Sequence, residues 1–497
     1  MNYNNTRGGA SLTAGQAILK GLADNGGLYV PEAFPALHTD WAQWASLPYS
    51  ELAFEILRLY LTDYNDNDLR TFTEKAYSPL NFTAPLTAPL HKTDEIPNAY
   101  FLELFHGRTL AFKDMALSLL PYLLTAAAKK YRPGVQTVIL TATSGDTGKA
   151  ALEAFADIDG VSISVFFPED GVSPMQKRQM VTQEGGNVHV FGVHGNFDDA
   201  QTGVKQIFND QDLVSRMTEA GLAFSSANSI NIGRLLPQVV YYIYAYGQLV
   251  RQNVIKPGET IDFTVPTGNF GNILAGYYAA QMGLPVRKLI CASNRNNVLH
   301  DFFTTGEYDL NRDFHTTISP SMDILLSSNL ERLLYHASGN DPEHVQNLMD
   351  ALKSQGKYQF NHATPLFESA FATEEETRAA MRDTAEKGYV TDPHTAVAYH
   401  AFRQSGGTEG NIPNVIISTA SPYKFAADVL SAILPAGSAA PDTADADCLL
   451  EKLARVSGTP APDALKTLSG KKVLHTQVCE IDKMKETLIK NTGINLM

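Results

Sequence analysis

The sequence predicts an α/β fold, in which helices cover both faces of largely parallel sheets. Compact runs of apolar and β-branched residues alternate with segments of helical period through most of the chain after residue 98. Repeated strand–loop–helix units of this kind place the carboxyl ends of parallel strands at one edge, where ligands bind. The expected strands span 138–143, 161–167, 188–193, 261–267, 288–293 and 415–419.

Each of the first four strands is followed by a loop and then by a helical segment. The loop SGDTG leads into KAALEAFA, and a second helix begins near Pro174 after PEDGVS. A third helix follows the turn at 196–199, and the helix ILAGYYAAQMG follows GNFGN. The loops between these strands and helices are therefore the first place to look for a binding site.

The N-terminal part of the chain is expected to be helical. Residues 13–22 and 50–61 carry apolar side chains at helical spacing, and turns rich in glycine and proline separate them. Because no cluster of reactive side chains occurs there, we expect a packing segment over 1–92. A catalytic region would follow over 93–435, and 436–497 would form a C-terminal segment with a loop-like start and helical character after it.

Composition and charge exclude several classes of partner. A net charge of −14, with no basic run longer than two residues, argues against nucleic-acid binding. Hydrophobic residues make up 44% of the chain and charged residues 19%, which is typical of a soluble globular protein. No apolar run is long enough to span a membrane, and the N-terminus MNYNNTRGGASL lacks a signal-peptide core. We therefore expect a cytoplasmic protein without a membrane partner.

No metal site is expected. The three cysteines are too few and too scattered for a disulfide framework or a zinc site (Cys291, Cys448 and Cys479). Three histidines near the other motifs lack acidic partners at metal-ligand spacing, and we interpret them as packing or surface residues (His106, His394 and His400).

Lys113 is the strongest candidate for a reactive side chain. It stands among Leu110, Ala111, Phe112 and Met115, and this apolar setting disfavours the ammonium form and lowers the pKa of the amine. Imine chemistry needs such a lysine, because only the neutral amine attacks a carbonyl. Many lysines in apolar stretches instead extend their amines to water, so the motif leaves both interpretations open.

The glycine loop TGNFGN, residues 267–272, lies between a strand and a helix and is suited to an anion. Its glycines let backbone N–H groups converge, and the helix that follows adds the positive end of its dipole. The spacing matches neither the dinucleotide motif G-x-G-x-x-G nor the P-loop. SGDTGKA also fails as a P-loop, since Ala150 stands where a hydroxyl would be required. A purely structural turn is the alternative for both loops.

Two further polar segments suggest a small anionic substrate. TATSGDTG, residues 141–148, offers hydroxyls and backbone donors that suit a carboxylate. FSSANSINIGR groups Asn228, Ser229, Asn231 and Arg234, and an arginine beside neutral donors suits a phosphate or a carboxylate. A solvated helix face is the alternative for that segment.

Together these motifs resemble the threonine synthase family. HGRTLAFKD, TATSGDTG, SSANSINIGRLLPQ, VPTGNFGNILAG and STASPYKF follow one another in that family's order, and the opening segment TRGGASLTAGQAILKGLADNGGLYVPE is also similar. Each motif is modest by itself, but five in register are specific. The resemblance covers nearly the whole chain and implies a pyridoxal-phosphate enzyme of fold type II, the tryptophan-synthase-β type.

The resemblance implies a set of residues that hold pyridoxal 5'-phosphate. Lys113 would carry the cofactor as an imine, and Thr419 would hydrogen-bond its pyridine nitrogen. The backbone amides of the glycine loop would hold its phosphate (Gly268, Asn269, Phe270, Gly271 and Asn272).

The resemblance also implies a substrate, O-phospho-L-homoserine, and the residues that bind it. One loop would receive the substrate carboxylate and border the cofactor's phenolic oxygen (Ser144, Gly145, Asp146 and Thr147). Asn228, Ser229 and Arg234 would hold the substrate phosphate, with Thr147 near it. The enzyme would release phosphate from Cγ, add water at Cβ and so form L-threonine. Residues 144–231 would form a smaller mobile domain that controls the entry of water.

Two positions depart from the family pattern. Arg108 stands where proline is expected and adds a charge near Lys113, and Ser421 stands where histidine is expected. Dehydration of serine or threonine on the same scaffold is one alternative function, although it would need no phosphate pocket. A catalytically silent relative that binds a ligand is another. A monomer or a small homo-oligomer is compatible with the sequence.

Overall fold

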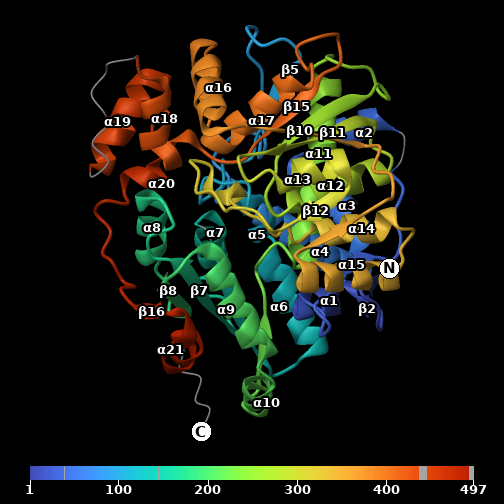
Figure 1. Ribbon diagram of the computed structural model, residues 1–497, viewed down its shortest axis with the longest axis vertical. Helices are drawn as coiled ribbons and strands as arrows, with labels where there is room; N and C mark the ends of the chain where they lie inside the picture. Colours follow the sequence, from blue (N-terminus) through green and yellow to red (C-terminus); the bar gives the residue numbers. More distant parts are fainter. Residues whose placement is uncertain (38–39, 144, 436–444, 492–497) are drawn as a thin grey trace.

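The structure, a computed structural model, describes residues 1–37, 40–143, 145–435 and 445–491. Two parallel sheets with helices on both faces organise the chain, which confirms the predicted α/β class (Figure 1). All six expected strands form, with ends that differ by no more than two residues from the prediction.

The larger sheet has six strands in the order β14-β11-β10-β15-β5-β4. Its strands pair in parallel except for β4, which runs antiparallel to β5 at the edge. The strands are β4 (Leu90–His91), β5 (Ala99–Glu103), β10 (Ile261–Pro266), β11 (Val286–Ser293), β14 (Phe367–Phe371) and β15 (Asn414–Ser418).

Alternation along these strands gives the larger sheet two apolar faces. Leu289 and Cys291 of β11 join the core that includes α12, whereas Ile290 and Ala292 join the core on the other side. Helix α17 contacts strands β10, β11 and β15 on that second side. The helices attached to this sheet are α5 (Asp114–Leu117), α6 (Leu120–Tyr131), α11 (Ile232–Arg251), α12 (Gly271–Gln281), α13 (Val298–Thr305), α14 (Leu330–Ala337), α15 (Pro342–Gln355), α16 (Glu374–Glu386), α17 (Pro393–Gln404) and α18 (Ala426–Ile433).

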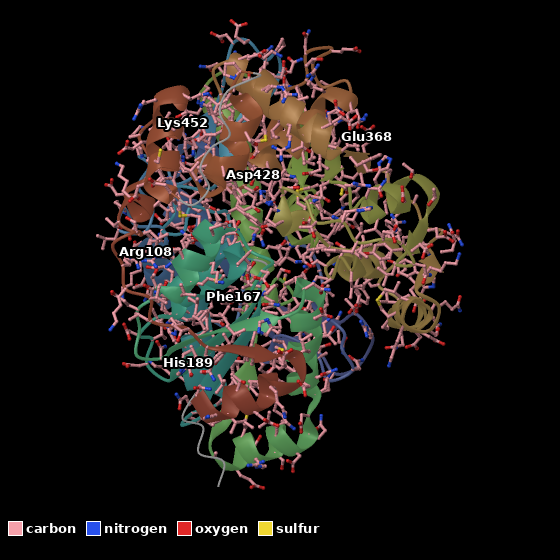
Figure 2. The ribbon with its side chains drawn as sticks, turned by 60° about the vertical axis from the view of Figure 1, so that its left-hand side comes forward. Arg108, Phe167, His189, Glu368, Asp428 and Lys452 are labelled. Carbon is pink, nitrogen blue, oxygen red and sulfur yellow. The ribbon has the colours of Figure 1, made fainter. Side chains whose placement is uncertain are left out.

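The smaller sheet has five strands, all parallel, in the order β16-β8-β7-β6-β9. Phe167 and His189 in Figure 2 mark β7 and β8. The strands are β6 (Gln136–Ala142), β7 (Val161–Pro168), β8 (Val188–His194), β9 (Leu222–Ser225) and β16 (Val478–Glu480). Its helices are α7 (Asp146–Phe155), α8 (Pro174–Val181), α9 (Phe197–Asn209) and α10 (Gln211–Glu219).

The N-terminal segment contains the expected helices and also a small antiparallel sheet that the helical pattern did not predict. Its helices pack against α6 and α11 of the larger sheet. The elements are β1 (Asn2–Asn5), β2 (Leu12–Thr13), α1 (Ala14–Lys20), β3 (Tyr29–Pro31), α2 (Trp41–Ser46), α3 (Tyr49–Tyr60) and α4 (Asp66–Ala76). A separate two-stranded antiparallel sheet pairs β12 (Glu307–Asp309) with β13 (Lys357–Gln359).

The C-terminal segment crosses from one sheet to the other. Helices α19 (Ala446–Ser457) and α20 (Asp463–Lys466) belong with α18 on the larger sheet. The chain then runs along α8, adds β16 to the edge of the smaller sheet, and forms α21 (Met484–Asn491), which packs on α9 (Figure 1). Residues 436–444 and 492–497 of this segment lie outside the described residues. Among the helices described here, none combines the length and apolar character that crossing a membrane requires.

Candidate active site

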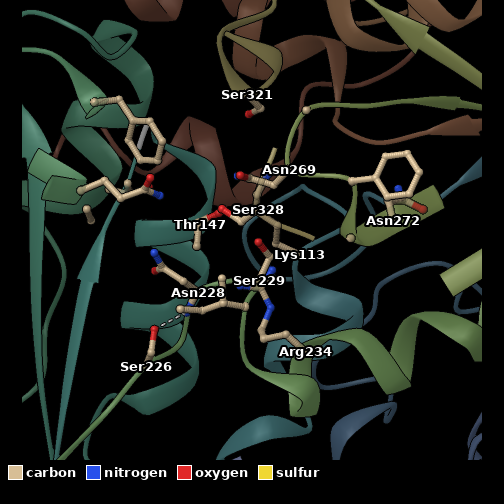
Figure 3. A pocket seen from close by; sticks show the side chains of 18 of the residues that line it. Lys113, Thr147, Ser226, Asn228, Ser229, Arg234, Asn269, Asn272, Ser321 and Ser328 are labelled. Carbon is tan, nitrogen blue, oxygen red and sulfur yellow. Dashed lines mark hydrogen bonds between the residues drawn. The ribbon is translucent and has the colours of Figure 1, made fainter. Parts of the chain in front are cut away.

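The carboxyl ends of strands from both sheets border one cavity, and most of the expected site residues line it (Figure 3). In the figure, Thr147 and Asn228 lie on one side of Lys113 and Asn272 lies on the other. The residues expected from the sequence that line this cavity are Lys113, Thr147, Asn228, Ser229, Arg234, Gly268, Asn269, Phe270, Gly271, Asn272 and Thr419. Gly145 and Asp146 lie beside the cavity without lining it, and Ser144 is outside the described residues.

The Lys113 side chain is buried, with 9% of the residue exposed, and its amine lies 4.5 Å from the centre of the Phe112 ring. Burial lowers the pKa of Lys113 to about 8, an effect that Asp146 opposes and that Arg234 and Lys424 reinforce. No carboxylate of the described residues forms an ion pair with this amine. A substantial fraction of Lys113 is therefore neutral and nucleophilic near pH 8.

The backbone that carries Lys113 is fixed on both sides. The N–H and the hydroxyl of Thr109 donate to the Asp114 carboxylate at 2.9 and 2.6 Å. The Phe112 N–H donates to the Thr419 carbonyl at 2.8 Å, so the segment that carries Lys113 is hydrogen-bonded to the loop after β15. Lys113 and Thr419 thus reach the cavity from two neighbouring segments that this hydrogen bond holds together.

The glycine loop forms the start of α12 and presents hydrogen-bond donors to the cavity. Phe270 adopts a left-handed backbone conformation, with φ of 62°, and the N–H groups of the first helical turn lack carbonyl partners within the helix. The hydroxyls of Tyr241 and Tyr242 donate to Asn272 Oδ1 at 2.6 and 2.8 Å, which turns Nδ2 outward as a buried donor without a partner among the described residues. This donor set fits a phosphate group.

Gly268 is the position in this loop where a side chain cannot fit. A Cβ atom there would lie 2.7 Å from the Ser321 carbonyl oxygen, whereas one at Gly271 would lie 3.4 Å from its nearest neighbour. The loop therefore approaches the 320–322 turn closely at Gly268 and leaves more room at Gly271.

Arg234 is a buried cation in the same cavity. Only 2% of the residue is exposed, and Nη1 donates to the Ala227 carbonyl at 2.6 Å. Among the described residues, its Nε has no hydrogen-bond partner and no carboxylate pairs with the guanidinium. Burial lowers the pKa of Arg234 to about 10, so the guanidinium stays charged at neutral pH. A buried cation without an anion is stabilised by an anionic ligand, which argues against the solvated-face alternative.

Ser229 is held by a pair of residues that sequence reasoning missed. Asn329 Nδ2 donates to Ser229 Oγ at 3.2 Å and to the Asn269 carbonyl at 2.9 Å. The fully buried Arg332 donates to Asn329 Oδ1 and to the Ile230 carbonyl. One amide therefore links the glycine loop to the segment that carries Arg234. No local pattern identifies Asn329, because its partners lie 60 and 100 positions away.

His394 also borders the cavity, which the sequence did not predict. It is buried and packs against Phe425, with ring centres 5.0 Å apart, as expected of a packing residue. Its Nδ1 lies 2.7 Å from Asp392 Oδ1, and its Nε2 accepts the Ser321 N–H at 3.1 Å. His394 therefore fixes the turn against which Gly268 lies. Helix α9 contributes further lining residues that no motif marked (Phe197, Gln201, Val204, Lys205 and Phe208).

The two positions that depart from the family pattern lie outside the cavity lining. The Arg108 side chain, labelled in Figure 2, is half exposed, and its Nη1 lies 3.5 Å from Glu153. Ser421 is buried, and its N–H donates to the Leu110 carbonyl at 3.1 Å. Within the described part of the chain, no cluster of histidine, cysteine or acidic residues could hold a metal ion.

Family models, sequence relatives and solved structures all point to one family. Family models described as threonine synthase N terminus, pyridoxal-phosphate dependent enzyme, and threonine synthase C-terminal match residues 2–77, 82–419 and 395–470. A threonine synthase from Pseudomonas aeruginosa is 42% identical over 86% of this chain and 89% of its own length. Human threonine synthase-like 1 is 43% identical over 84% of this chain but only 58% of its own length. The crystal structure of pyridoxal-phosphate-bound threonine synthase from Brucella melitensis is 36% identical, covers 99% of both chains and gives a TM-score of 0.84.

Proposed function

Since the chain belongs to the threonine synthase family of pyridoxal-phosphate-dependent lyases, we propose that it converts O-phospho-L-homoserine and water into L-threonine and inorganic phosphate, the last step of threonine biosynthesis. One observation supports this choice of substrate most directly. The buried Arg234 lacks a carboxylate partner in the described structure, yet it shares a cavity with Lys113 and the glycine loop. A phosphate on the substrate would supply the missing anion.

The cofactor of this family is pyridoxal 5'-phosphate, which serves as an electron sink when bound. We propose that the amine of Lys113 holds it covalently, that the N–H groups of residues 268–272 hold its phosphate, and that Thr419 faces its pyridine nitrogen. The unpaired Asn272 Nδ2 and the open helix start support the phosphate assignment. The lowered pKa of Lys113 supports the assignment of the amine.

For the substrate, we propose that the loop from Ser144 to Thr147 receives the carboxylate, and that Asn228, Ser229 and Arg234 bind the phosphate. Arg234 Nε is a buried donor without a partner among the described residues, so it is available to the phosphate. Lys113 would remove the proton at Cα and return protons to the carbon chain, a role that suits an amine of lowered pKa. Arg234 would stay with the phosphate as it leaves Cγ, and water would add at Cβ.

The reaction excludes water early and uses it later, so we propose that residues 144–231 move as a smaller domain relative to the rest of 93–435. The position of the cavity between the loops of the two sheets supports this arrangement. Because β16 and α21 pack on the smaller sheet, the end of the 436–497 segment would move with it, while 1–92 would stay with the larger sheet. We also propose a cytoplasmic monomer or small homo-oligomer that binds no nucleic acid; the free cysteines support a reducing compartment.

The assignment is tested by incubating the purified, cofactor-loaded protein with O-phospho-L-homoserine. We expect equal amounts of L-threonine and inorganic phosphate. Formation of a keto acid and ammonia from serine or threonine, without phosphate release, would instead identify a dehydratase. A coloured protein that is inert toward all three amino acids would identify a ligand-binding relative.

Gly268→Val is expected to weaken cofactor binding by at least about tenfold, since a Cβ atom 2.7 Å from the Ser321 carbonyl forces the loop away from the phosphate. The measurement is a titration of apo protein with pyridoxal phosphate, followed by absorbance. Gly271→Ala is the matched control in the same loop, and it is expected to change the affinity less. Equal affinities for Gly268→Val and wild type would show that the loop does not hold the cofactor phosphate.

A further inference from the structure

A buried ion pair joins the two sheets beside Lys113. Lys424 Nζ lies 2.6 Å from Asp146 Oδ1, and the two side chains are 0% and 3% exposed. Asp146 opens α7 on the smaller sheet, whereas Lys424 lies in the short helix Pro422–Phe425 that follows β15 of the larger sheet. The pair therefore fastens the carboxylate-binding loop of one sheet to the Thr419 loop of the other.

Each member of the pair is further held by a neutral group. Lys424 also donates to the Thr109 carbonyl at 2.9 Å, and Gln176 Nε2 donates to Asp146 Oδ1 at 2.9 Å. Gly145 makes the second contact possible, because a Cβ atom there would lie 2.4 Å from the Gln176 side chain. Both donors reach the same oxygen of Asp146, Oδ1, which is therefore held from two sides.

Loss of either member of this pair alone would change the net charge around Lys113. The charged groups that act on its amine are Asp146, Arg234, Lys424 and Asp114. Asp114 accepts a hydrogen bond from the Thr109 N–H, and the carbonyl of the same Thr109 accepts one from Lys424. Burial would raise the pKa of Asp146, but Lys424 and then Lys113 outweigh it, and the pKa lies well below its usual value. Without Lys424, a carboxylate at this depth would be strongly destabilised.

We propose that Lys424 is a positioning residue, whose ammonium keeps Asp146 ionised and in place, so that a negative charge stays beside Lys113 and the 145–147 loop stays at the cavity. This proposal rests on the proposed function only for the identity of the cofactor. In this proposal Asp146 does not contact the substrate carboxylate. The hydroxyls and N–H groups of the neighbouring loop residues would bind that carboxylate instead.

The test uses apo protein and pyridoxal phosphate alone, so that its result does not depend on the substrate. Three variants are compared with wild type: Asp146→Asn, Lys424→Met and the double variant. The first measurement is the pH midpoint of the rate of cofactor uptake. Asp146→Asn leaves Lys424 as an uncompensated cation near Lys113, so the midpoint should fall by about one pH unit from its wild-type value. In the double variant both charges are gone, and the midpoint should return toward wild type.

The second measurement is cofactor affinity. Each single variant should bind the cofactor at least about tenfold more weakly, because each leaves a buried charge unpaired, while the double variant should lose less than the product of the two. Losses that multiply, or an unchanged midpoint in Asp146→Asn, would overturn the proposal. Should Lys424→Met not fold, Asp146→Asn alone decides through its midpoint. A midpoint shift in a protein that does not turn over O-phospho-L-homoserine would uphold this proposal and reject that substrate.

Discussion

Replacing Lys113 with alanine is expected to reduce kcat by at least about 10²- to 10⁴-fold, the range for loss of a positioned acid–base group. The variant loses both the amine that would hold the cofactor and the group that would move protons at Cα. The measurement is the rate of phosphate release from O-phospho-L-homoserine at saturating cofactor. A high concentration of methylamine is expected to restore part of the rate, since a free amine can occupy the space that the side chain leaves.

Borohydride reduction followed by peptide mapping checks the assignment independently of turnover. Lys149, which is partly buried, and Lys424, which is buried, also lie near the site, but each has a carboxylate within 2.9 Å, whereas Lys113 has no such partner among the described residues. The pyridoxyl group is therefore expected on Lys113. Recovery of the group on Lys149 or Lys424 would contradict the assignment. Lys288→Ala is a suitable control for the kinetics of Lys113→Ala. Lys288 pairs with Glu368 at the outer side of the larger sheet, so this variant should keep full activity.

The pH dependence of cofactor uptake follows from the same burial. The neutral amine is the reactive form, and the pKa of Lys113 is lowered to about 8. Below that pH the rate should rise about tenfold per pH unit, and above it the rate should level off. A profile that keeps rising to pH 10 would indicate an exposed lysine of ordinary pKa.

Local patterns were sufficient for the parts of the fold and the site that depend on neighbouring residues. Strands such as β7 and β10 are continuous apolar runs between clear turn signals, and their bounds followed from the sequence. The glycine loop and the segment around Arg234 follow the same logic, because a strand end and a helix start place their donors together. The resemblance to a family then supplied the roles that chemistry alone left open.

The rest of the site depends on contacts between residues far apart in the chain. Lys424 meets Asp146 only because two different sheets come together, and Asn329 reaches Ser229 from 100 positions away. His394 was predicted as a packing residue, and it packs, but its place at the cavity depends on the 320–322 turn. Short strands were also missed. The exposed three-residue strand β16 is defined by its pairing with β8 rather than by an apolar pattern of its own.

Arg234→Ala is expected to give a folded, coloured protein with a kcat/KM for O-phospho-L-homoserine reduced by roughly 30- to 4,000-fold. Removing one partner of a buried charged hydrogen bond costs about 2–5 kcal/mol, which corresponds to that range. Cofactor binding should change little, since residues 268–272 rather than Arg234 would hold the cofactor phosphate. Steady-state kinetics and a cofactor titration on the same preparation separate the two effects.

A substrate analogue without phosphate locates the effect within the cavity. L-homoserine shares the carboxylate and amine of the substrate, so its binding, followed through the absorbance of the cofactor, should be nearly equal in wild type and Arg234→Ala. Arg287→Ala is the matched control, because this arginine pairs with Asp262 at the opposite end of the larger sheet. Its kcat/KM should stay close to wild type. If Arg234→Ala weakened L-homoserine as much as O-phospho-L-homoserine, the guanidinium would be shaping the whole cavity, and the phosphate would have to bind to other donors.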